Sequence, residues 1–356
     1  MVFCTLFDSN YMDKGLVMYR SLRKHTDDLQ MYILAMDEQC GTILNSYGYD
    51  HLTVIPVDEF SVKMGLEEIR KTRKRGEFCW TCTSHLIDYI LTEYHEEQCT
   101  YVDSDLRFYA DPQCLLDEMK DQSIQIVEHR FENSALGRMN QSISGTYCVQ
   151  FNTFRNEEEA LDLLHWWEEK CRESCSNDSD REAGVYGDQG YLELWGQKET
   201  VNVLSNPGGG VAPWNVSQYR FLSMNPEKEE IMLQDKRSKK SFQLVFYHFH
   251  NISYITPRKV NINVFNWGDI DPQITGAVYI PYLREIDAVK TELQERFGFY
   301  PYIQHHPGLE EKKPAPGKSI AERIKAIDSQ VFSKIYLRTV IKKKKEKWEK
   351  NSIISF

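Results

Sequence analysis

Two carboxylates one residue apart are the first feature of this sequence that could carry chemistry. Asp103 and Asp105 follow the strand-like run 100–102, and further apolar residues come after them. Carboxylates at positions i and i+2 can turn their oxygens toward one hard cation where the backbone bends at a strand end. Mg²⁺ and Mn²⁺ accept such oxygens and keep positions for phosphate oxygens and water. The pair therefore predicts a divalent metal site.

An Asp-x-Asp pair also occurs in ordinary solvated turns, so a third ligand matters to this interpretation. Far downstream, the strand-like run 244–249 ends in the stretch His248-Phe249-His250. Neutral imidazole is a common metal ligand, so a histidine of this strand end is a plausible third ligand. Either His248 or His250 could serve, because residues two apart on a strand share a face.

The surrounding pattern predicts an α/β fold with a mostly parallel central sheet. Strand-like runs alternate with helical spacing, which favours helices on both faces of the sheet. The expected strands in this part of the chain are 2–7, 31–35, 52–57, 100–102 and 146–154. In such sheets ligands bind at the carboxyl ends of the strands, where Asp8 and Asp103 lie.

Composition excludes some classes of function. The 356 residues carry a net charge of −10, which argues against nucleic-acid binding through the whole surface. The N-terminal run reaches Asp8 too early for a signal peptide or membrane span, so we expect a cytoplasmic protein. The nine cysteines form no dense framework and fit a reducing compartment. A zinc site joining Cys79-x-x-Cys82 to Cys171-x-x-x-Cys175 is a weaker hypothesis, because both segments have helical spacing.

Five motifs occur in an order that resembles a known enzyme family. They are "FDSNYMDKGLVMYRSL", "YVDSDLRFYADP", "GDQGYL", "GGGVAPWN" and "FYHFHN". Together they resemble bacterial GT-A glycosyltransferases of family 8, the group of glycogenin and the lipopolysaccharide galactosyltransferases. The resemblance covers residues 2–251. It implies a GT-A, Rossmann-like nucleotide-diphospho-sugar transferase fold, Mn²⁺ or Mg²⁺ at the Asp-x-Asp, and a UDP-sugar as donor.

The resemblance assigns five residues to the nucleotide side of the site. Asp8 matches the acidic residue that contacts the base, and Tyr11 matches the ring that stacks on it. Asp103 is expected near the ribose, and Ser104 and Gln150 are expected to contact the donor. A simpler role for Asp8 is that of a helix cap.

Metal and sugar binding are assigned in the same way. Asp103, Asp105 and His248 match the metal ligands, and Asp188 and Gln189 match the catalytic pair that holds the donor sugar. Asp188 alternatively caps a helix that begins at Gln189. The chain has Cys-Val-Gln at 148–150 where relatives often have Asn-Val-Gly, so the donor sugar stays undefined.

These assignments imply transfer of a sugar to a polysaccharide or glycolipid acceptor, with retention of the anomeric configuration. Two alternatives stay open, a nucleotidyltransferase and an inactive protein that binds sugar nucleotides. The Gly-rich, basic N-terminal loop typical of nucleotidyltransferases is missing from residues 1–16.

We divide the chain into a catalytic domain at 1–306, a proline-containing linker at 307–318 and a basic tail at 319–356. Residues 331–356 hold eight Lys or Arg and two Glu, a net charge of +6, with apolar residues at helical spacing. Such a segment suits an anionic membrane surface, which predicts a peripheral location on the inner face of the membrane. Its apolar stripe could instead pack on the acidic body of the enzyme.

Overall fold

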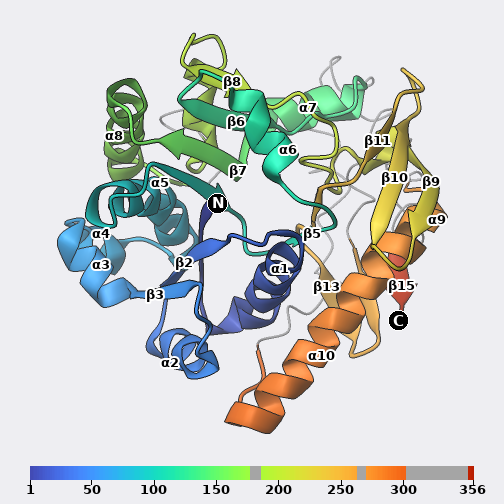
Figure 1. The fold of residues 1–356 in the computed structure, drawn as a ribbon, viewed down its shortest axis with the longest axis horizontal. Coiled ribbons are helices and arrows are strands. Elements are labelled where there is room, and N and C mark those ends of the chain that lie inside the picture. The colour runs from blue at the N-terminus through green and yellow to red at the C-terminus, as the bar shows by residue number, and fades with distance from the viewer. Residues whose placement is uncertain (177–185, 263–269, 302–351) are drawn as a thin grey trace, which may run out of the picture.

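The computed structural model of the protein describes residues 1–176, 186–262, 270–301 and 352–356. Its centre is a seven-stranded sheet with the order β3-β2-β1-β4-β7-β6-β8 (Figure 1). In that order the strands are Leu52–Pro56, Gln30–Ala35, Val2–Phe7, Gln98–Val102, Tyr147–Arg155, Ile124–Glu128 and Val201–Val203. The pairs β3-β2, β2-β1, β1-β4 and β6-β8 are parallel, whereas β7 is antiparallel to both its neighbours. The predicted α/β class and mostly parallel sheet are confirmed.

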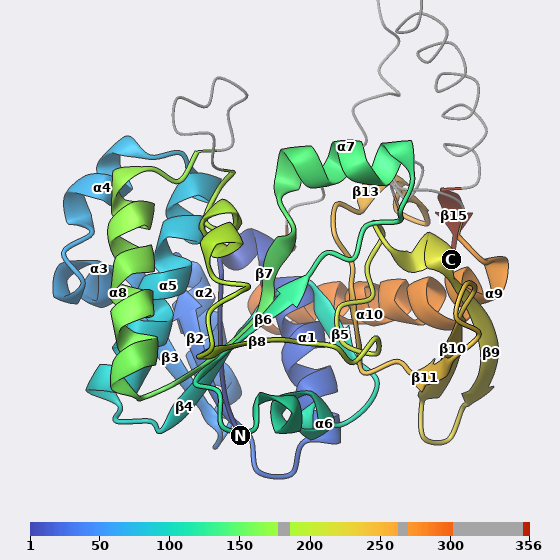
Figure 2. The same ribbon diagram turned by 90° about the horizontal axis from the view of Figure 1, so that it is seen from above.

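Helices cover both faces of this sheet, as its apolar strands require (Figure 2). One face packs against α1 (Met12–His25), α2 (Glu38–Tyr47) and α10 (Ile280–Phe297). The other face packs against α3 (Val57–Lys63), α5 (Arg75–Glu93) and α8 (Glu158–Glu173). Helix α5 begins at Arg75, and its first turns bring Arg75 and Trp80 to the pocket described below.

Short helices and a second sheet complete the chain around this core. The antiparallel strands β9 (Tyr219–Asn225), β10 (Glu230–Asp235) and β11 (Ser241–Gln243) project beside α10 (Figure 1). The remaining α-helices are α4 (Glu67–Thr72), α6 (Gln113–Leu116), α7 (Ala135–Ser144) and α9 (Pro272–Ile274).

The end of the chain returns to the body of the protein. Strand β15 (Ile353–Ser355) pairs with β14 (Lys259–Asn261), which in turn pairs with β13 (Ser253–Thr256). Ser352 is fully buried. The predicted linker at 307–318 and tail residues 319–351 lie outside the described residues. Along the part of the chain that is described, no helix has the length and apolar character needed to cross a membrane.

Candidate active site

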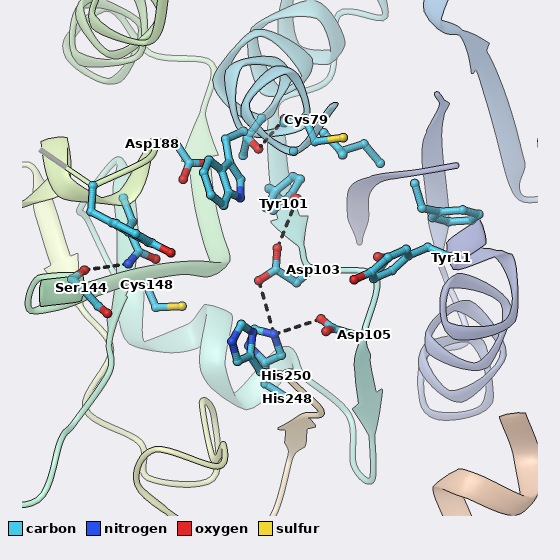
Figure 3. A pocket seen from close by; sticks show the side chains of 18 of the residues that line it. Tyr11, Cys79, Tyr101, Asp103, Asp105, Ser144, Cys148, Asp188, His248 and His250 are labelled. Carbon is cyan, nitrogen blue, oxygen red and sulfur yellow. Dashed lines mark hydrogen bonds and ion pairs between the residues drawn. The ribbon is translucent and has the colours of Figure 1, made fainter. Parts of the chain in front are cut away.

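A cavity of about 500 Å³ opens at the carboxyl ends of β1 and β4. The sequence predicted a ligand at this edge of the sheet, and most of the predicted site residues line the cavity. They are Asp8, Tyr11, Asp103, Ser104, Asp105, Asp188, Gln189 and His248, together with the alternative ligand His250. Figure 3 shows Tyr11 and Asp188 on opposite sides, with Asp103 between them.

Strand pairing explains how His248 reaches the two carboxylates across 143 residues of sequence. The chain turns after Asp103 and continues as β5 (Leu106–Phe108), which pairs antiparallel with β12 (Phe246–His248). In this register Leu106 lies opposite His248, and the Phe249 amide donates to the Asp105 carbonyl at 2.9 Å. The pairing thus fixes His248 beside the Asp-x-Asp turn.

The side chains of these residues form a compact group of oxygen and nitrogen donors. His248 Nε2 lies 2.9 Å from Asp105 Oδ1 and 3.7 Å from Asp103 Oδ2. His250 and Cys148 add two further potential ligand atoms to this group. The ligand atoms of Asp105, His248 and His250 lie within 4.8 Å of one another, and so do those of Asp103, Cys148 and His248. Both histidines therefore lie at the carboxylates (Figure 3).

His248 and Asp105 each stabilise the ionised form of the other. Burial alone would lower the pKa of His248, but the charge and hydrogen bond of Asp105, with smaller contributions from Cys148 and Asp103, together outweigh burial and raise that pKa well above its usual value. Burial would raise the pKa of Asp105, and His248 instead holds it below the ordinary range. Burial raises the pKa of Asp103, because the attraction of His248 offsets it only in part. A divalent cation at this position would take the place of the His248 proton as counter-charge.

Gln150 has a different position from the one we predicted. It was expected to contact the donor, but its side chain is fully buried in β7 and does not line the cavity. Gln150 Oε1 lies 2.9 Å from His248 Nδ1. Gln150 therefore orients the imidazole and leaves Nε2 directed at the carboxylates.

The turn after β1 forms the wall of the cavity that was predicted to bind the nucleotide. Asp8 accepts a hydrogen bond from the Tyr11 amide at 3.1 Å, which caps the short helix Ser9–Tyr11. It also pairs with Arg75. Asp8 thus has the capping role that we considered and still lines the cavity. The Tyr11 side chain is 40% exposed, with Lys14 Nζ 3.6 Å from its ring centroid, so its ring is accessible for stacking.

Asp188 lies deep on the opposite side of the cavity. It is 5% exposed, and the indole of Trp167 donates to its backbone carbonyl at 3.0 Å. Burial, followed by the nearby charge of Asp103, raises the pKa of Asp188 to about 7. Its side chain makes no capping hydrogen bond to the short helix Gln189–Leu194, unlike the alternative we considered. Gln189 Nε2 donates to the Ser144 carbonyl at 2.6 Å, which links it to the end of α7.

Several residues that line the cavity were missed by the sequence analysis. The Trp214 ring packs edge-on against His248, with ring centroids 5.1 Å apart, and against His129 at 5.2 Å. Trp80 lies 5.9 Å from Tyr186 in a tilted pair. Trp214 belongs to the quoted "GGGVAPWN" motif, which was a usable signal, whereas nothing in the sequence singled out His129 or Trp80.

The hypothetical zinc site is not supported. All nine cysteines are free, and the four cysteines at 79, 82, 171 and 175 form no group of close metal ligands among the described residues.

Comparisons with known proteins give distant relatives. No protein-family model matches the chain. Two proteins of Bacillus subtilis (strain 168), both described as uncharacterized, are similar to it. YfnF is 29% identical over 265 residues, covering 72% of this chain and 84% of its own. YfnD is 26% identical over 306 residues, covering 84% and 94%.

The chain also resembles solved structures of glycosyltransferases. They include the galactosyltransferase LgtC in complex with donor and acceptor sugar analogues, at 14% identity and a TM-score of 0.46, covering 81% of this chain and 96% of that one. Mouse xyloside xylosyltransferase 1, in its apo form, has 14% identity and a TM-score of 0.41, covering 60% and 86%. Similarity at this level does not define the activity of this chain.

Proposed function

We propose that this protein is a metal-dependent glycosyltransferase that takes a sugar from a UDP-sugar. The observation that carries the proposal is the arrangement of one cavity. A carboxylate pair with its histidine lies between an accessible ring, Tyr11, and a buried acid, Asp188. A nucleoside-diphosphate sugar needs these three kinds of contact, for its base, its diphosphate and its sugar.

The donor set fits Mn²⁺ or Mg²⁺. Two carboxylates supply oxygens and one imidazole supplies a nitrogen, a combination that suits Mn²⁺ well. Asp103, Asp105 and His248 would hold the ion, with Gln150 fixing the ring of His248. When bound, the ion stabilises the negative charge that develops on the diphosphate leaving group.

The other residues act on the donor itself. The Tyr11 ring stacks on the base, and Asp8 binds the nucleotide after exchanging its contact with Arg75. Asp188 stabilises the positive charge that develops on the sugar or orients its hydroxyls, together with Gln189. Fixing donor and acceptor in one cavity removes most of the entropy cost of aligning them. We propose retention of configuration, as the motif resemblance implies.

The acceptor is proposed to be a polysaccharide or glycolipid. The loop 207–210 and the following "VAPWN" resemble bacterial sugar transferases that act on such acceptors more than they resemble glycogenin. A glycolipid acceptor agrees with a cytoplasmic protein that docks on the inner face of the membrane through its basic tail.

Donor hydrolysis tests the proposal without knowledge of the acceptor. The full chain is incubated with Mn²⁺ and each of several UDP-sugars, with and without added pyrophosphate, and both UDP and UTP are measured. Slow UDP release that stops with EDTA supports a glycosyltransferase. Formation of UTP and a sugar 1-phosphate that requires pyrophosphate would identify a nucleotidyltransferase, and formation of neither UDP nor UTP from any donor would favour an inactive binding protein. Mass spectrometry of nucleotide sugars that co-purify with the protein would then identify the donor.

A further inference from the structure

A second group of potential metal ligands lies between α5 and α8, two helices that pack side by side (Figure 1). It consists of Asp88 on α5 and of His165 and Glu168 on α8. One ligand atom from each lies within 4.8 Å of the other two, and His165 Nε2 is 3.3 Å from Asp88 Oδ1. His165 and Glu168 are three residues apart on one helix, so they face the same side. None of the three lines the candidate active site.

The group buries two carboxyl groups whose ionised forms the protein does not stabilise: burial, followed by the charge of Asp88, raises the pKa of Glu168 to about 8, and burial also raises the pKa of Asp88. Asp88 and Glu168 are each only 8% exposed, and Glu168 Oε1 has no hydrogen-bond partner among the described residues. Arg172 acts on Glu168 from a distance, but its guanidinium donates to the carbonyls of Met64 and Gly65. A buried carboxylate without a partner is strongly unfavourable, and such groups are usually paired or bound to a metal.

We propose that Asp88, His165 and Glu168 bind Zn²⁺ and so cross-link α5 to α8. Zinc accepts both imidazole nitrogens and carboxylate oxygens as ligands, and imidazole suits it better than it suits Mg²⁺ or Ca²⁺. The His165 side chain is 54% exposed, which gives the ion a route from solvent and leaves room for water as the fourth ligand.

The two helices that carry this group, α5 and α8, also contact the active-site cavity or residues that line it. Trp167, which precedes Glu168, donates to the backbone carbonyl of Asp188, and α5 carries Trp80 and Thr83 into the active-site cavity. A metal that fixes α5 to α8 would therefore steady both walls of the donor-sugar side. Its role is structural, and it does not depend on the proposed activity.

Calorimetric titration with Zn²⁺ tests the site in the full-length chain. Both groups of potential ligands in the cavity contain His248, so His248→Ala is used as the background to remove their contribution. We expect one equivalent of Zn²⁺ to bind this protein. Adding Glu168→Gln or His165→Ala should weaken that binding at least tenfold, whereas adding Glu169→Gln, at an exposed neighbour on the same helix, should not change it.

Thermal unfolding gives a second readout. In EDTA and at a pH above 8, where Glu168 is ionised, the Glu168→Gln protein should melt above its background, because a buried charge has been removed. With Zn²⁺ the order should reverse, because only the background protein gains stability from the ion. Failure of the background protein to bind Zn²⁺, or equal affinity in the Glu168→Gln and Glu169→Gln proteins, would overturn the proposal. His165→Ala alters an exposed side chain, so the test stands even if the change at Glu168 impairs folding.

Discussion

Gln150 Oε1 lies 2.9 Å from Nδ1 of His248, in the fully buried part of β7 beneath the cavity. A neutral His248 that donates from Nδ1 to this oxygen keeps its lone pair on Nε2, which faces Asp103 and Asp105. Outer partners of this kind commonly change metal affinity by about 10- to 100-fold. Gln150 is therefore a positioning residue, which acts on the metal only through His248.

Replacing Gln150 by Leu should weaken Mn²⁺ binding about 10- to 100-fold, because the imidazole loses its fixed orientation. Gln150→Glu keeps an oxygen acceptor and should restore most of the affinity. The matched control is Gln125→Leu, an equally buried glutamine of the same sheet that is bonded to Asn202 and not to His248. Calorimetric titration of Mn²⁺ in the presence of UDP measures all three. Equal losses in the two Leu variants would mean that Gln150 contributes only to packing.

Removing a metal ligand should abolish activity without unfolding the protein. We expect Asp105→Ala to lose metal-dependent UDP release, because this carboxylate is needed to hold the cation at the diphosphate. The exposed Asp121 provides a control, since Asp121→Ala should leave release unchanged. Circular dichroism checks that the fold is intact. Full activity of Asp105→Ala at limiting Mn²⁺ would exclude this residue as a ligand.

The two histidines should differ in their contribution to metal binding. His248→Ala should weaken Mn²⁺ affinity more than His250→Ala, because His248 lies within 4 Å of both carboxylates and is oriented by Gln150. The same calorimetric titration compares them. The reverse order would transfer the ligand role to His250.

Metal affinity should increase as the pH rises. Without the ion, the charge and hydrogen bond of Asp105, together with Cys148 and Asp103, outweigh burial and raise the pKa of His248, which favours the protonated ring. Metal binding must displace that proton, and affinity should therefore rise with pH until His248 is neutral. Titrations in buffers of different ionisation enthalpy should reveal proton release, which His248→Ala should reduce. Affinity that falls with rising pH would contradict the assignment.

The sequence predicted the sheet and most of the cavity lining because these depend on local signals. The strands read as apolar runs, and Asp8 and Asp103 follow two of them directly. The contact between His248 and Asp105 depends instead on the pairing of β5 with β12, because a strand-like run such as 244–249 does not show which distant segment it pairs with. Gln150 was misplaced because it meets the ring of His248, which comes from a distant part of the chain, and so contacts the imidazole and not the cavity. Arg75 was missed because its contact with Asp8 joins the start of α5 to the turn after β1, and no local pattern marks such a long-range pair.

Asp188 should affect catalysis more than nucleotide binding. We expect Asp188→Asn to lower turnover far more than it weakens the affinity for UDP, because the side chain is placed to meet the sugar. Burial and Asp103 raise the pKa of Asp188 to about 7, so wild-type turnover should fall as the pH drops below that value and Asp188 takes up a proton. A metal beside Asp103 cancels part of the repulsion and moves this fall to lower pH. Rates with and without acceptor, together with UDP titrations, measure both effects. Equal losses of turnover and UDP affinity would assign Asp188 to the nucleotide or to a structural role.

The basic tail should attach the protein to anionic membranes. Residues 342–345 are four consecutive lysines, and each basic side chain near such a surface contributes about 1 kcal/mol. Changing all four to Gln should therefore weaken binding to anionic liposomes by about a thousandfold. This change is preferable to truncation near Ser319, because truncation would also remove β15, which pairs with β14. A control with the same charge change replaces the exposed lysines 71, 198, 228 and 240 by Gln.

Sedimentation with liposomes of graded anionic content measures this binding at several salt concentrations. The wild-type and control proteins should pellet with anionic vesicles and be released by salt, because screening weakens attraction between exposed charges. The tail variant should stay in solution under the same conditions. Equal pelleting of all three proteins, or binding that ignores both salt and anionic lipid, would mean that residues 342–345 do not dock on the membrane. The apolar stripe would then be expected to pack on the rest of the chain, whose net charge without residues 331–356 is −16, that is −10 minus +6.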